Sequence, residues 1–195
     1  MWNDRYAETG FAYGDAPNDF LVAEAGRLPA GGRVLCLAEG EGRNGVWLAG
    51  QGFEVTGVDG SSVGLEKAQR LAEARGVKIT TVVADLAEFE LGSACWDGVV
   101  SVWAHVPPAL RQRLHRAVVG ALKPGGVMIL EAYTPEQVTL KTGGPPDPAM
   151  CMTLAGLREE LAGLEILVGV ERRRMVQEGR YHQGESAVVQ VVGRR

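Results

Sequence analysis

The chain has 195 residues, a usual size for one domain with short elaborations. Apolar residues make up 46% and charged residues 23%, which excludes a disordered chain. The formal charge of −4 gives no overall attraction for nucleic acid or anionic lipid, and no stretch is apolar for long enough to predict a membrane span. The three cysteines are widely spaced, and the start lacks a signal-peptide profile. We therefore expect a cytoplasmic protein without a metal site and without nucleic-acid or membrane partners. The oligomeric state is left open.

Helical and strand-like segments alternate along the chain. Apolar residues at helical spacing predict helices, and short apolar runs between glycine-rich turns predict strands. The predicted helices cover residues 17–28, 46–49, 61–75, 107–122 and 153–161, and the predicted strands cover residues 33–37, 53–58, 77–83, 96–103, 127–132, 164–175 and 181–192. Residues 123–126 are predicted to be a turn, and residues 177–180 a hairpin turn.

Strands separated by helices predict a parallel sheet that is wound in both directions. The two last strands follow each other without a helix, which adds an antiparallel strand at one edge. The predicted fold is therefore α/β: a doubly wound, mostly parallel seven-stranded sheet, Rossmann-like, with a C-terminal antiparallel hairpin.

A glycine-rich loop follows the first predicted strand. Residues 40–45 match the GxGxxG pattern, and Asp59 ends the next strand, as in dinucleotide-binding proteins. A pyrophosphate, however, needs a positive cradle at the helix N-terminus, and Glu39 and Glu41 place two carboxylates there. S-adenosylmethionine carries an ammonium and a sulfonium instead of phosphates, and Asp59 suits its ribose hydroxyls. These residues favour S-adenosylmethionine, with an NAD-linked oxidoreductase as the alternative.

Two further segments suit the same cofactor. Asp85 and Leu86 follow the third strand, where a carboxylate can accept the adenine amino group and Leu86 can cover the ring; the alternative for Asp85 is a cap of the following turn. Trp103 ends the fourth strand on the carboxyl side, where open α/β sheets bind ligands. We expect Trp103, His105 and Glu131 to line the mouth of an acceptor pocket at this edge.

The order of these pieces resembles a class I S-adenosylmethionine-dependent methyltransferase. The resemblance is carried by the segments CLAEGEGRNGVWLA, GVDGSS, VVADL, WDGVVSVWAHVPP and LKPGGVMILE. The opening WNDRYAETGFAYGDAPNDFL is similar to the bacterial group related to tellurite-resistance and thiopurine methyltransferases. Cys36 replaces the usual acidic residue of the first strand, and Ala38 replaces the first loop glycine. The methionine ammonium is then left to Glu39, to Glu41 or to a backbone carbonyl.

The resemblance also implies how the single domain, residues 1–195, is organised. Residues 1–30 form a lid and a helix, residues 33–134 the cofactor-binding core, and residues 135–195 the substrate-side elements. Tyr6, Phe11 and Tyr13 belong to the lid. The predicted cofactor-binding residues are Tyr13, Ala38, Glu39, Gly40, Gly42, Asn44, Asp59, Gly60, Ser61, Asp85, Leu86 and Trp103.

Two histidines are predicted to be catalytic. His105 lies just past the fourth strand, where it can act as a general base or hydrogen-bond the substrate; the alternative is a loop cap. His182 lies in the final hairpin, and the resemblance implies that it approaches the substrate. His115 is predicted to lie on a solvated helix face, and residues 172–174 to form a charged edge strand. We expect methyl transfer to a small molecule such as a thiol or chalcogen species, with a non-catalytic cofactor-binding module as a further alternative.

Overall fold

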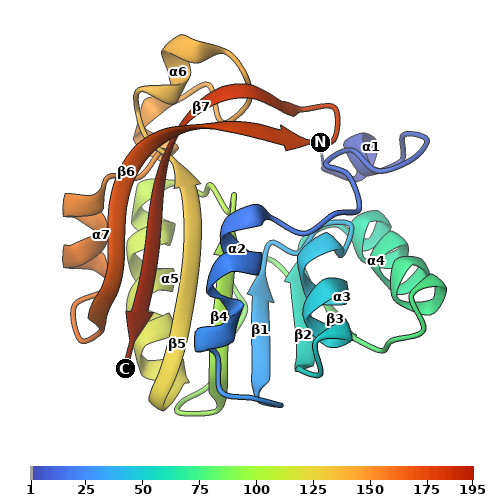
Figure 1. The fold of residues 1–195 in the computed structure, drawn as a ribbon, viewed down its shortest axis with the longest axis horizontal. Coiled ribbons are helices and arrows are strands. Elements are labelled where there is room, and N and C mark those ends of the chain that lie inside the picture. Colours follow the sequence, from blue (N-terminus) through green and yellow to red (C-terminus); the bar gives the residue numbers. More distant parts are fainter. Residues whose placement is uncertain (1) are drawn as a thin grey trace.

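A seven-stranded sheet with the order β3-β2-β1-β4-β5-β7-β6 forms the centre of the molecule in the computed structural model, which describes residues 2–195 (Figure 1). β1 to β5 run parallel, and β7 is antiparallel to both β5 and β6. The strands are β1 (Arg33–Leu37), β2 (Glu54–Asp59), β3 (Thr80–Val83), β4 (Trp96–Val102), β5 (Leu122–Tyr133), β6 (Glu165–Glu178) and β7 (His182–Arg194). The predicted α/β sheet and its hairpin are confirmed.

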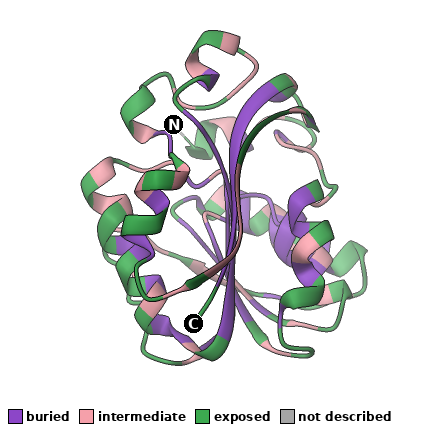
Figure 2. Cartoon of the chain, turned by 60° about the vertical axis from the view of Figure 1, so that its left-hand side comes forward, coloured by how far each residue is buried: buried purple, intermediate pink, exposed green. Residues whose placement is uncertain are grey.

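Helices cover both faces of this sheet, whose central strands β1, β4, β5 and β7 are mostly buried, whereas the edge strands β3 and β6 are more exposed (Figure 2). α2, α3 and α4 pack on one face through a core that includes Leu21, Val46 and Leu71. α5 and α7 pack on the other through Leu114 and Leu157. The helices are α1 (Trp2–Tyr6), α2 (Asp19–Glu24), α3 (Arg43–Gly50), α4 (Ser62–Ala74), α5 (Pro108–Ala121), α6 (Gln137–Leu140) and α7 (Leu154–Glu160), with short 3-10 turns at Ala25–Arg27 and Pro148–Met150.

Local capping explains where the helices begin. The Ser61 hydroxyl accepts a hydrogen bond from the Gly64 amide at 3.1 Å and so caps α4, as the sequence predicts. Asn18 caps α2 in the same way through the Leu21 amide. These caps satisfy amides that lack a partner within the helix.

The structure departs from the predicted elements at β5 and in the placement of the hairpin strands. The predicted turn at residues 123–126 is part of β5, because Gly125 and Gly126 exchange backbone hydrogen bonds with Arg195 at the end of the chain. The antiparallel strand β7 lies inside the sheet, and the edge strand is β6.

No helix within residues 2–195 is long and apolar enough to cross a membrane.

Candidate active site

The glycine loop lies at the carboxyl end of β1 and leads into α3. Its backbone is left-handed at Ala38 (φ 52°), Gly40 (φ 60°) and Gly42 (φ 93°). A Cβ at Gly42 would lie 2.6 Å from the Cβ of Ala68 in α4, so only glycine allows this approach of loop and helix. Ala38 adopts the same region with a side chain, a strain that is characteristic of functional loops.

Asp59 holds this loop from the end of β2. Its carboxylate is 7% exposed; Oδ2 accepts from the Gly40 amide at 2.9 Å, and Oδ1 accepts from the Ser61 amide at 2.8 Å. Each carboxylate oxygen has a second acceptor position. The group therefore fits a vicinal diol such as the ribose of S-adenosylmethionine, as the sequence predicts.

The two loop carboxylates have internal partners. Glu39 points beneath the start of α3, where Oε1 accepts from the Gly45 amide at 2.7 Å. Glu41 accepts from the Ala12 amide at 2.7 Å and from Lys67 Nζ at 2.8 Å. Glu39 thus caps a helix, and Glu41 joins the loop to the N-terminal segment.

The position of Glu39 also bears on the choice of cofactor. Its carboxyl occupies the helix N-terminus, the place where a pyrophosphate would bind. Burial raises the pKa of Glu39 to about 7, with the Gly45 hydrogen bond opposing the rise. Burial also raises the pKa of the neighbouring Cys36 thiol well above its usual value. The loop is therefore built without a phosphate cradle.

The N-terminal segment covers the glycine loop. Tyr6 lies so close that a Cβ at Gly40 would stand 2.7 Å from its hydroxyl, and one at Gly64 would stand 2.8 Å from its ring. The amide oxygen of Asn3 accepts from the Ser61 hydroxyl at 2.6 Å. Lys67 accounts for two further contacts, with the carbonyls of residues 8 and 10. Residues 2–12 thus lie across the loop from the side of α4 (Figure 1).

Four aromatic side chains meet at the carboxyl ends of β4 and β5. The Trp103 and Tyr133 rings stack with centroids 4.2 Å apart, and His182 meets their edges at 5.3 and 5.4 Å. Tyr13 lies over His182 at 4.6 Å. We call Tyr13, Trp103, Tyr133 and His182 the acceptor-side cluster. It joins the N-terminal segment, the sheet and the final hairpin.

His105 lies beside this cluster with both ring nitrogens engaged. Nδ1 is 3.1 Å from the Trp103 carbonyl, and Nε2 accepts from the Tyr133 amide at 3.0 Å. Burial lowers the pKa of His105 to about 3, with His182 adding to the effect. This geometry favours the loop-capping alternative, in which His105 positions the Trp103 backbone.

His182 is placed differently. Its Nδ1 and the Tyr133 hydroxyl are buried and have no hydrogen-bond partner among residues 2–195. Nδ1 lies 3.6 Å from a Glu178 oxygen, just beyond hydrogen-bond range. Burial lowers the pKa of His182, and the Glu178 carboxylate offsets only part of this. A neutral imidazole here retains a lone pair for a proton.

A buried ion network lies behind the cluster and was not predicted as a unit. Glu178 accepts from Arg43 Nη2 at 2.7 Å, from Trp103 Nε1 at 2.6 Å and from Asn18 Nδ2 at 2.8 Å. Burial raises the pKa of the Glu178 carboxyl, but His182, Arg43 and Asn18 together bring it below its usual range. The carboxylate therefore stays ionised.

A second carboxylate, Glu131, continues the network from β5. It is fully buried and accepts from Arg174 at 2.8 and 2.7 Å and from Gln190 at 2.7 Å. Asn18 donates to Glu131 as well as to Glu178, and so bridges the two acids. The sequence predicts that Arg174 belongs to a charged edge strand. In the structure, its guanidinium instead pairs with the buried Glu131 carboxylate. Glu131 is at the predicted edge, but it is occupied by these partners.

The remaining predicted residues are distributed as follows. Asn44 is buried and accepts from the Asn18 amide at 3.0 Å. Asp85 is exposed and accepts from the Ala87 amide at 2.8 Å, which is the turn cap of the alternative interpretation. Leu86 packs against the core on the α5 side, and Gly60 is exposed beside Asp59.

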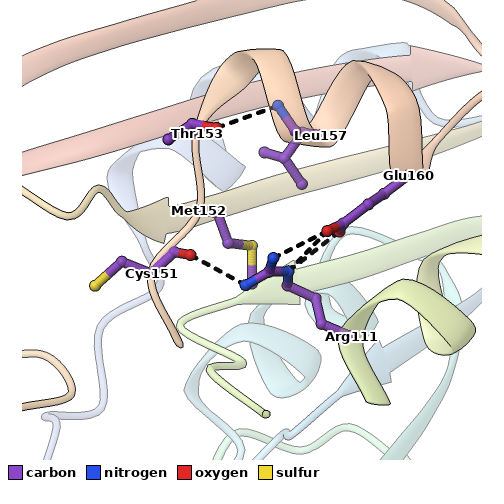
Figure 3. A pocket seen from close by; sticks show the side chains of 7 residues that line it. Arg111, Cys151, Met152, Thr153, Leu157 and Glu160 are labelled. Carbon is purple, nitrogen blue, oxygen red and sulfur yellow. Dashed lines mark hydrogen bonds and ion pairs between the residues drawn. The ribbon is translucent and has the colours of Figure 1, made fainter. Parts of the chain in front are cut away.

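His115 was predicted wrongly. It is 1% exposed, and its Nδ1 lies 2.7 Å from Glu160, because α7 covers this face of α5. Glu160 also receives a forked ion pair from Arg111, which reaches the Cys151 carbonyl too (Figure 3). A cavity of about 190 Å³ borders these residues. It lies between α5 and the chain around α7, away from the glycine loop.

Comparisons with known proteins agree with this geometry. Residues 34–126 match the family described as "Methyltransferase domain". The structure solved in work on the conversion of a disulfide bond into a thioacetal group during echinomycin biosynthesis is 24% identical, with a TM-score of 0.77, and the match covers 99% of this chain and 87% of that one.

Two further solved structures have the same fold. An S-adenosylmethionine-dependent methyltransferase from Methanosarcina mazei is 19% identical, with a TM-score of 0.69 and coverage of 89% and 96%. TehB from Haemophilus influenzae is 18% identical, with a TM-score of 0.73 and coverage of 89% and 61%. No curated protein matches the chain.

Sheet order, glycine loop and domain match lead to one conclusion. The order 3-2-1-4-5-7-6, with strand 7 antiparallel, is the class I methyltransferase sheet. The matched residues 34–126 contain the glycine loop and Asp59. Residues 34–126 therefore match a methyltransferase domain, the sheet has the class I methyltransferase fold, and S-adenosylmethionine is the cofactor that they imply.

Proposed function

We propose that the protein methylates a small molecule through a thiol or another chalcogen nucleophile, as a cytoplasmic enzyme related to the tellurite-resistance group. The observation that carries the proposal is the acceptor-side cluster, which stands beside the glycine loop at the carboxyl ends of β4 and β5. Sulfur makes favourable contacts with aromatic rings because it is polarisable. An aromatic cluster of this kind suits a soft nucleophile.

The charges around the cluster support the same acceptor class. Arg43 pairs with Glu178 and Arg174 pairs with Glu131, so both cations are matched by buried carboxylates. A phosphorylated acceptor would have to compete with these pairs. Two of the similar structures favour the proposal further. One comes from work on the conversion of a disulfide bond into a thioacetal group, which is sulfur chemistry, and the other is TehB.

The residues divide the work as follows. S-adenosylmethionine supplies a methyl carbon that its sulfonium activates for displacement. We assign Asp59 to the ribose hydroxyls and the glycine loop to the methionine part. Residues 2–14 exclude water, and the cluster aligns the acceptor. His182 removes the acceptor proton, whereas His105 positions the Trp103 backbone.

Binding and turnover test the proposal separately. S-adenosylhomocysteine should bind in calorimetry, while NADH at millimolar concentration should not. Formation of S-adenosylhomocysteine should then depend on an acceptor from a panel of thiols, selenols and chalcogen oxyanions. His182→Asn should lower turnover at least about a hundredfold without changing S-adenosylhomocysteine affinity. Its matched comparison is His105→Asn, which should lower turnover less.

Three outcomes would contradict the proposal. Saturable micromolar NADH binding would favour the oxidoreductase alternative. Binding of S-adenosylhomocysteine without turnover on any of these acceptors would favour the non-catalytic module. Turnover restricted to oxygen or nitrogen acceptors would remove the chalcogen assignment.

A further inference from the structure

Glu178 and His182 face each other across the last pair of the β6–β7 hairpin. They are register partners in the antiparallel ladder, so their side chains project to the same face. A glycine at position 179 (φ 63°) and two further residues close the turn between them. The hairpin thus presents a carboxylate and an imidazole side by side at the acceptor-side cluster.

The carboxylate is held rigidly by other elements. Arg43 from the start of α3, Trp103 from the end of β4 and Asn18 from the cap of α2 each donate a hydrogen bond to it. Glu178 is 8% exposed. Three donors from three elements fix the orientation of the Glu178 carboxylate relative to the glycine loop. The carboxylate can therefore orient the His182 imidazole beside it.

This arrangement selects the proton position on the imidazole. Nδ1 is the nitrogen that faces Glu178, at 3.6 Å, and no other described residue hydrogen-bonds it. A proton on Nδ1 is attracted by the carboxylate, whereas a lone pair there is repelled. The proton therefore resides on Nδ1, and the lone pair resides on Nε2, for which the described chain supplies no hydrogen-bond donor.

We propose that Glu178 is a positioning residue, which holds His182 in the Nδ1–H form so that Nε2 takes the proton of a neutral, protic acceptor. This rests on the methyl transfer proposed above. The X–H bond of the acceptor breaks, its electron pair forms the bond from X to the methyl carbon, and the proton moves to Nε2. The electron pair of the broken methyl–sulfur bond stays on the departing sulfur. Glu178 then stabilises the imidazolium, which later releases its proton to water.

The proposal narrows the acceptor class. A base is needed for an acceptor that carries its proton at neutral pH, such as a thiol, and not for one that is already deprotonated, such as a selenolate or a chalcogen oxyanion. The other charged or titratable groups that face His182 are Arg43 from α3, Arg5 from α1 and His105 past β4, besides Tyr13 and Tyr133 of the cluster. Both arginines disfavour the imidazolium, so Glu178 is the group that favours it.

Histidine NMR tests the pair without any acceptor. The chain has only three histidines, so long-range proton–nitrogen correlations resolve each ring. At neutral pH, His182 of the wild-type protein should show a protonated Nδ1 and an unprotonated Nε2. In Glu178→Gln this preference should weaken, and the pKa of His182 should fall further, because an opposite charge is lost.

The matched control lies on the opposite face of the sheet. Glu160 is equally exposed, at 8%, and holds both an arginine and His115. Glu160→Gln should change the His115 signals and leave His182 unchanged. With a thiol acceptor, Glu178→Gln should lower kcat about tenfold or more and move the pH profile, whereas Glu160→Gln should do neither.

The wild-type spectrum alone decides the proposal if Glu178→Gln fails to fold. A dominant Nε2–H form of His182 would overturn it, as would a His182 spectrum that Glu178→Gln leaves unchanged. Neither result would contradict the proposed methyl transfer, which S-adenosylhomocysteine formation measures independently. Conversely, His182 could carry its proton on Nδ1 in a protein that shows no turnover on any acceptor. The proposed function would then be wrong, while the interaction between Glu178 and His182 would stand.

Discussion

Asp59 illustrates what one residue contributes to the cofactor site. Asp59→Ala removes the acceptor of the Gly40 and Ser61 amides and, in our proposal, of the ribose hydroxyls, so S-adenosylhomocysteine binding should weaken by about 2–3 kcal/mol, as for hydrogen bonds to a charged group. Calorimetry measures this directly. Asp97→Ala is the matched control, because Asp97 also accepts from a backbone amide, that of Arg33. An equal loss of affinity in both variants would remove Asp59 from the site.

Single residues differ in how far their roles follow from the sequence. Asp59 is predictable because its signal is local: an acid directly after a buried strand and near a glycine loop. Glu178 carries no such signal, since it reads as one polar residue of a hairpin. Its partners Asn18, Arg43 and Trp103 lie 75 to 160 residues away along the chain. Only the folded sheet shows that they share one carboxylate.

At the scale of an element, α3 is distinguished by the acid beneath its N-terminus. The pKa of Glu39 is raised from its ordinary 4.5 to about 7, so the folded state binds this proton more tightly than the unfolded state does. Its contribution to stability is present below about pH 4.5 and is lost as pH rises through 7. The loss should approach about 3 kcal/mol by pH 8, at 1.36 kcal/mol per unit of pKa shift.

Glu39→Gln tests this, because glutamine still accepts from Gly45 but does not ionise. Urea unfolding at pH 5 and pH 8 should show a smaller decline of stability in this variant than in the wild type. Glu54→Gln, at an exposed carboxylate of β2, should decline like the wild type. Identical slopes in all three proteins would mean that Glu39 keeps its ordinary pKa.

Helices and strands were predictable from the sequence where their own residues determine them. They were not predictable where a segment distant in the sequence determines their bounds or their burial. The Ser61 cap and the periodic apolar residues predict α4 within a residue or two. His115 was misplaced because α7, about 40 residues later, covers a face of α5 that reads as polar. The extension of β5 through a glycine-rich turn was missed for the same reason, since Arg195 completes it.

At the scale of the whole molecule, the site forms where the N-terminal segment meets the turn of the C-terminal hairpin, between β6 and β7 (Figure 1). Residues 12–18 of the N-terminal segment contact residues 178–180 of the hairpin: Arg180 donates its amide to the Ala12 carbonyl at 2.8 Å, and Asn18 donates to Glu178. This junction connects the segment that covers the glycine loop to the acceptor-side cluster. Cofactor affinity and overall stability should therefore depend on it together.

Gly179 is the point of closest approach, and its substitution tests that coupling. A Cβ there would collide with the backbone of residues 12–14, and the left-handed conformation (φ 63°) adds its own cost for alanine. Gly31→Ala is the matched control, because Gly31 has nearly the same φ, 65°, and nothing within 4 Å of its Cβ position. Gly179→Ala should lose about 1–3 kcal/mol more in urea unfolding than Gly31→Ala, the usual cost of overpacking. It should also weaken S-adenosylhomocysteine binding, which Gly31→Ala should not. Equal losses of stability, with cofactor affinity unchanged in both variants, would show that the N-terminal segment and the hairpin are not coupled through this contact.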